Sequence, residues 1–99
     1  MSEGLSITDQ LEPYEWDSRA VAAYEAAIEA INGAVGAYSA LISAEEAKSA
    51  PDATVVAAAR AEQTRLTRER EALRPDDTDQ IANARRQYSM LARTVRESR

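Results

Sequence analysis

The chain has 99 residues, a length that suits one domain, and its formal net charge at pH 7 is −5. It contains no cysteine and no histidine. A disulfide framework, a thiolate nucleophile, an imidazole base and the usual zinc ligands are therefore excluded. We expect a protein that is not an enzyme and that needs no cofactor and no metal.

Charge is distributed unevenly along the chain. Residues 1–50 carry nine acidic side chains and two basic ones, whereas residues 51–99 carry ten arginines and eight acids. An acidic first half and a basic second half can attract each other within one chain or between chains. The overall acidity argues mildly against a dedicated nucleic-acid binder.

The composition also bears on origin and location. One lysine, Lys48, stands among the 12 basic residues, and this preference for arginine together with abundant alanine favours a bacterial or phage source. The first residues lack the charged-then-apolar pattern of a signal peptide, and no apolar run approaches membrane-spanning length. We therefore expect a cytoplasmic protein without membrane contact.

Residues 1–12 mix Leu5, Ile7 and Leu11 with polar residues, which predicts an N-terminal arm that docks apolar side chains without a long helix of its own. Residues 13–99 then form a single helical domain. Pro13 is tolerated in a first helical turn, and Asp17 is a second candidate start. We predict the first helix at about residues 14–48.

This first helix carries an apolar heptad pattern. Its members alternate in spacing between three and four residues, which is typical of a helix packed along its length in coiled-coil fashion. They are Val21, Tyr24, Ile28, Ile31, Val35, Tyr38 and Ile42.

A second stripe of small residues flanks the heptad stripe and includes Ala23, Ala30, Gly33 and Ala37. Small side chains allow another helix to approach closely, so we expect one neighbour over each stripe. The alternative is that alanine simply favours a helix on a solvated face. Gly33 and Gly36 are interpreted as a packing notch, with a hinge or a break as the alternative.

Two shorter helices are predicted at about residues 51–74 and 77–96. Ser49 and Asp77 are their expected N-caps, with Asp52 and Gln80 three residues further on. The apolar line of the second helix is thin (Val55 or Val56, Ala59, Leu66, Leu73), and Arg65 and Glu69 are expected to pair on its solvated face. The third shows Ile81, Ala84, Tyr88, Leu91 and Val95 at heptad spacing.

Short connections imply antiparallel neighbours. The predicted fold is therefore all-α, an antiparallel three-helix bundle with one long N-terminal helix and coiled-coil-like packing. The later helices are too short to cover the first, so apolar surface on residues 20–47 should remain for a partner.

Acidic clusters are explained without a metal. Glu25 and Glu29 lie one turn apart on the polar face, whereas a di-metal bundle needs inward-facing carboxylates. Asp76, Asp77 and Asp79 are explained by helix capping. Tyr24, Tyr38 and Tyr88 occupy core positions and are expected to pack.

Two functions remain. The first is a protein–protein interaction module (an adaptor, scaffold or regulatory subunit) that self-associates, with a dimer favoured, or binds a helical protein. Its interface candidates are the seven heptad residues together with Tyr14 and Trp16, whose alternative role is to cap the bundle end. The second is a nucleic-acid-associated regulator whose basic C-terminal helix contacts phosphates through Arg85, Arg86, Arg93 and Arg96. The alternative for these arginines is a solvated face.

Overall fold

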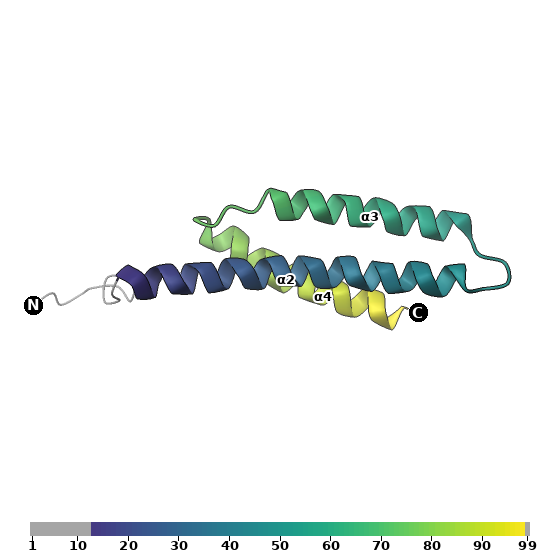
Figure 1. Cartoon of the computed structure of the whole chain (residues 1–99), viewed down its shortest axis with the longest axis horizontal. Coiled ribbons are helices and arrows are strands. Elements are labelled where there is room, and N and C mark those ends of the chain that lie inside the picture. Colours follow the sequence, from purple (N-terminus) through teal and green to yellow (C-terminus); the bar gives the residue numbers. More distant parts are fainter. Residues whose placement is uncertain (1–12, 99) are drawn as a thin grey trace, which may run out of the picture.

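The fold consists of three consecutive helices. A computed structural model describes the backbone of residues 13–98 and the side chains of residues 18–98. The helices are α2 (Pro13–Glu46), α3 (Ala53–Glu71) and α4 (Thr78–Glu97), and they run up, down and up (Figure 1). Both shorter helices pack against α2. The predicted all-α, three-helix bundle with a long N-terminal helix is confirmed, whereas coiled-coil-like packing stays a prediction.

Helix α2 is the central helix, on which both others pack, and it is about 51 Å long at 1.5 Å per residue. It continues without a break through Gly33 and Gly36, so no hinge is present there. The packing-notch interpretation is also wrong for Gly36, because a Cβ atom built there meets nothing within 4 Å. At Gly33 the nearest atom is Nη2 of Arg96, at an ordinary contact distance of 3.9 Å.

The start of α3 corrects one predicted cap. Asp52 is the N-cap, and its Oδ1 atom accepts a hydrogen bond from the Thr54 amide at 2.9 Å. Ser49 lies earlier, in the connection. The predicted start at residue 51 is therefore two residues early, because Ser49 and Asp52 are both good capping residues and local sequence does not decide between them.

The turn from α3 to α4 is held by Gln80. Asp77 is the N-cap of α4 as predicted, with Oδ1 accepting from the Gln80 amide at 3.0 Å. The Gln80 side chain then accepts from the Arg74 amide at 2.7 Å and donates to the Ala72 carbonyl at 3.2 Å. Leu73, in the same turn, is buried.

The core lies where both apolar sides of α2 meet their neighbours. Gln63 and Arg70 of α3 reach Val35 and Asn32, so α3 follows the heptad side. Helix α4 lies on the small-residue side, where Ala23 lines a groove with Ile81. The buried cluster includes Ala27, Ile31, Ala34 and Ala37 of α2, Leu66 and Leu73 from the α3 segment, and Ile81, Ala84, Tyr88, Ala92 and Val95 of α4.

One property of α2 differs from the expectation above. The segment Ser18–Glu46 is long and apolar enough, by length and composition, to cross a membrane, with a mean hydropathy of 1.2 in its 18-residue window. The statement that no apolar run approaches membrane-spanning length is therefore wrong. Alanine and aliphatic residues raise the hydropathy of this segment, and 28% of the window is buried inside the bundle.

Candidate interaction surface

The seven heptad residues differ in how far the bundle covers them. Ile31 and Ile42 are buried, and the four residues Tyr24, Ile28, Val35 and Tyr38 are half-buried. Val21, the first member, is 54% exposed. The side chains of the other two interface candidates, Tyr14 and Trp16, lie outside the described residues. Within the described part, the apolar heptad surface left open is therefore concentrated at Val21.

The position of α3 explains why Val21 is open. Three contacts mark the antiparallel course of α3 along α2: Arg60 to Glu46 at 3.3 Å, Gln63 to Ser39 at 2.8 Å, and Arg70 to Asn32. Helix α3 ends one residue after Arg70, and the chain then turns towards α4. The first heptad positions of α2 therefore lie beyond the last turn of α3, as Figure 1 also shows.

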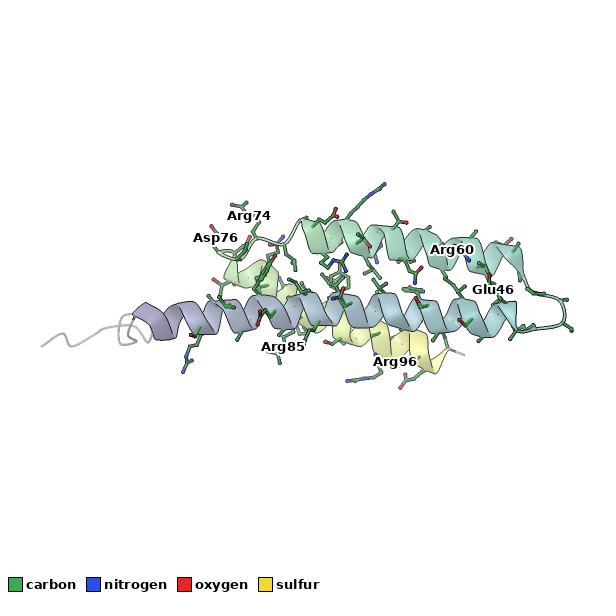
Figure 2. The ribbon with its side chains drawn as sticks, viewed as in Figure 1. Glu46, Arg60, Arg74, Asp76, Arg85 and Arg96 are labelled. Atoms are coloured by element: carbon green, nitrogen blue, oxygen red, sulfur yellow. The ribbon has the colours of Figure 1, made fainter. Side chains whose placement is uncertain are left out.

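The contact between α2 and α3 is partly polar. The Gln63 side-chain amide donates to the Val35 carbonyl at 3.0 Å and to the Ser39 hydroxyl at 2.8 Å. At the far end Arg60 and Glu46 face each other (Figure 2). Both of these side chains are more than half exposed, so their ion pair contributes little to stability. Gln63, whose side-chain amide reaches two acceptors on α2, fixes the position of α3 along α2 more specifically than this ion pair does.

A side-chain hydrogen bond joins α3 to α4. The Tyr88 hydroxyl donates to Glu69 Oε1 at 3.0 Å, and Arg65 pairs with Glu62 at 2.9 Å. The predicted pair of Arg65 with Glu69 is wrong: Arg65 pairs with Glu62, and Glu69 accepts from Tyr88. Burial raises the pKa of Tyr88, and the hydrogen bond to Glu69 raises it further. The hydrogen bond to Glu69 orients Tyr88, which is buried in the core as predicted.

Glu45 lies at the end of the bundle where α2 connects to α3, and it holds that connection in place. Its carboxylate accepts from the Asp52 amide and from the Lys48 ammonium, both at 2.9 Å. These bonds, the one from Asp52 first, hold the pKa of Glu45 below its usual value. Sequence reasoning missed this residue. Its signal is weak: an acidic residue at a helix end, seven positions before a capping aspartate.

A groove runs between the N-terminal half of α2 and the start of α4. It consists of two adjoining depressions of about 630 and 470 Å³ that share Ala23, Thr78 and Ile81. The first extends to Arg19 and Pro75, and the second follows α4 to Met90. We call it the α2/α4 groove. It faces a different neighbour from Val21, because Val21 belongs to the side that α3 follows.

The four arginines proposed as phosphate contacts are all exposed on α4. Arg85 and Arg96 project on the side away from α3 (Figure 2). Arg85 and Arg86 line the α2/α4 groove, and Arg86 also bonds Asn83. Among residues 18–98, no ion pair involves any of the four. They therefore form an exposed basic side of α4, on which the Arg96 guanidinium lies beside Gly33 of α2.

Metal binding has no support in the described residues, where no group of three or more acidic side chains is placed to hold an ion. Asp77 acts as a helix cap, and Asp76 lines the groove. Comparison with protein-family models, with curated proteins and with solved structures finds no match.

Proposed function

We propose that this chain is a small helical protein–protein interaction module, acting as an adaptor, scaffold or regulatory subunit in the cytoplasm without catalysis of its own. The observation that carries the proposal is the 54% exposure of Val21 at the head of a heptad pattern whose later members pack inside the bundle. A valine at an a position that none of the described helices covers is a natural contact for another helix.

The partner that we assign to this surface is a second copy of the chain. Closed two-fold dimers are the most common oligomers, and they bring the same patch of each subunit together. In such a dimer the Val21 side chains of the two copies pack against each other, as apolar heptad residues do in a coiled coil. The lean core, rich in alanine, gains apolar burial in this way.

Sedimentation velocity at micromolar concentration tests self-association. The wild-type chain is expected to sediment as a dimer, and Val21→Glu as a monomer, because the new carboxylate would lie unpaired in the interface. Val55→Glu is the matched control, since Val55 is also an exposed helical valine (37%) but lies at the opposite end of the bundle. A monomeric wild type, or equal behaviour of both variants, would overturn the proposal.

A second candidate function is nucleic-acid binding through the basic side of α4. Its support is the set of four exposed arginines on α4. Binding carried by such contacts weakens steeply as salt rises. In a gel-shift assay at low salt, Arg85→Ala/Arg86→Ala should lose binding, while Arg68→Ala/Arg74→Ala, which removes the same charge from elsewhere, should retain it. No shift with the wild type would eliminate this function.

A further inference from the structure

The α2/α4 groove is apolar at its base and basic along its walls. Ala20, Ala23 and Ile81 form the apolar part, and Met90 at one end is 60% exposed. Met90 and the open apolar depression beside it form a surface whose burial by another apolar segment would be favourable. The described residues leave it open.

Three arginines surround this groove. Arg19 comes from α2, and Arg85 and Arg86 come from α4. Among residues 18–98, Asp76 is the only acidic side chain that lines the groove. Among residues 18–98, none of these arginines has a salt-bridge partner. The groove therefore fits a segment that combines apolar side chains with negative charge.

The N-terminal arm, residues 1–12, has this composition. Its apolar residues alternate with polar ones, and it carries three acids but no lysine or arginine: Leu5, Ile7 and Leu11 against Glu3, Asp9 and Glu12. The arm lies outside the described residues. Its apolar residues suit the apolar base of the groove, and its negative charge is opposite in sign to the arginines around it.

The distances allow the arm to reach the groove of its own chain. It joins α2 at Pro13, and Ala20 lies seven helical residues further on, or about 10 Å. The groove then follows α4 from Thr78 to Met90, about 18 Å at the helical rise. Twelve extended residues span about 40 Å, which exceeds the sum of both paths.

We propose that the α2/α4 groove is a binding surface for acidic, apolar peptide segments and that residues 1–12 of the same chain occupy it. Arg85 and Arg86 face the acids of the arm, and Leu5, Ile7 and Leu11 cover Ala23, Ile81 and Met90. Covalent attachment favours this occupant over a segment from solution, because it raises the effective concentration of the arm. The inference does not depend on self-association, which uses the Val21 side of α2.

Paramagnetic relaxation enhancement in the full-length chain tests this arrangement. The chain has no cysteine, so Ser6→Cys gives one attachment point for a nitroxide label. With the label on the ¹⁵N-labelled chain, the amide signals of Ala23, Ile81 and Met90 should lose most of their intensity. The signals of residues 53–57, at the other end of the bundle, should keep theirs. A second label at Ser2→Cys repeats the measurement from another position.

Charge reversal in the groove supplies the matched comparison. Arg85→Glu/Arg86→Glu should restore the groove signals, whereas Arg93→Glu/Arg96→Glu makes the same change of charge outside the groove lining and should leave the loss in place. Circular dichroism establishes that each variant is folded. Unchanged groove signals in the labelled wild type would overturn the proposal.

A mixed sample distinguishes an arm that binds the groove of its own chain from an arm supplied by a second copy. Label-bearing ¹⁴N chains are combined with unlabelled ¹⁵N chains, so that only contacts between chains broaden the signals. Signal loss confined to the self-labelled sample supports the proposal. Equal loss in the mixed sample would overturn it in favour of an arm supplied by a second copy.

Discussion

Glu45 shows how one side chain joins two helices. It is 9% exposed, although it is a carboxylate in the last turn of α2, where the helix dipole disfavours negative charge. The hydrogen bonds from Asp52 and Lys48 offset that cost and lower its pKa. Glu45 therefore fixes the position of the connection before α3.

This lowered pKa predicts a pH dependence of stability. A carboxylate with a pKa lower in the folded than in the unfolded state stabilises the fold above about pH 4.5, its ordinary value, and the contribution is lost as the pH falls through the folded-state pKa. Glu45→Gln should therefore melt at a lower temperature than the wild type at pH 7, and the difference should shrink towards pH 3. Thermal melts across this range check the prediction; a difference independent of pH would contradict it.

Gly36 is a second residue with a measurable effect. It lies in the interior of α2 with open space around its Cα atom, so alanine fits without a clash. Gly36→Ala should raise the free energy of unfolding by about 1 kcal/mol, the usual difference between the two residues inside a helix. Urea unfolding measures it. Destabilisation by this change would mean that another chain packs against the Gly36 side of α2.

At the scale of the element, the N-terminal end of α3 depends on its cap, Asp52. Asp52→Ala removes the hydrogen bond to the Thr54 amide and should cost about 0.5–2 kcal/mol. Ser49→Ala changes a neighbouring capping-type residue that lies outside the helix and should have little effect. Chemical denaturation of both variants gives the comparison, and a larger loss from Ser49→Ala would contradict the assignment of Asp52 as the cap.

The packing of α2 gives a stronger contrast. Ile31 is fully buried, so Ile31→Asp places an unpaired charge in the core and should prevent folding or cost several kcal/mol. Glu29, two positions earlier, is exposed, and Glu29→Ala should change stability by about 0.5 kcal/mol or less. Circular dichroism melts distinguish the two, and equal small effects would show that the assigned apolar face is wrong.

These elements also show which structural features can be predicted from the sequence. The heptad period reveals α2 and its buried side, because burial along a helix must repeat with the helical turn. Where α3 ends relative to Val21 depends on the position at which Arg70 meets Asn32, a tertiary contact that leaves no local pattern. The same holds for Glu69, whose partner is Tyr88 on another helix.

The candidate surfaces also differ in how far they can be predicted from the sequence. The exposed position of Val21 and the existence of the α2/α4 groove follow from the stagger of three helices, which no single segment encodes. By contrast, the four arginines of α4 could be assigned to an exposed side from sequence, because polar residues on an amphipathic helix face away from its apolar stripe. Their arrangement around the groove required the structure.

For the whole molecule, α2 serves as a spine that carries α3 over one apolar side and α4 over the other. This leaves separate surfaces at the N-terminal end: Val21 on the heptad side and the groove on the small-residue side. The two surfaces also differ in charge. Glu25 lies one helical turn after Val21, whereas arginines surround the groove.

This difference predicts salt effects of opposite sign. Pairing two Val21 surfaces brings like charges together, so screening should strengthen the dimer, whereas the contact between an acidic arm and a basic groove should weaken. Raising NaCl to about 1 M, where the Debye length is about 3 Å, should therefore lower the dimer dissociation constant in sedimentation experiments and restore the groove signals of the Ser6-labelled chain. Val21→Glu should remain monomeric at both salt concentrations. A dimer that weakens with salt would instead indicate that the acidic half of one copy contacts the basic half of another.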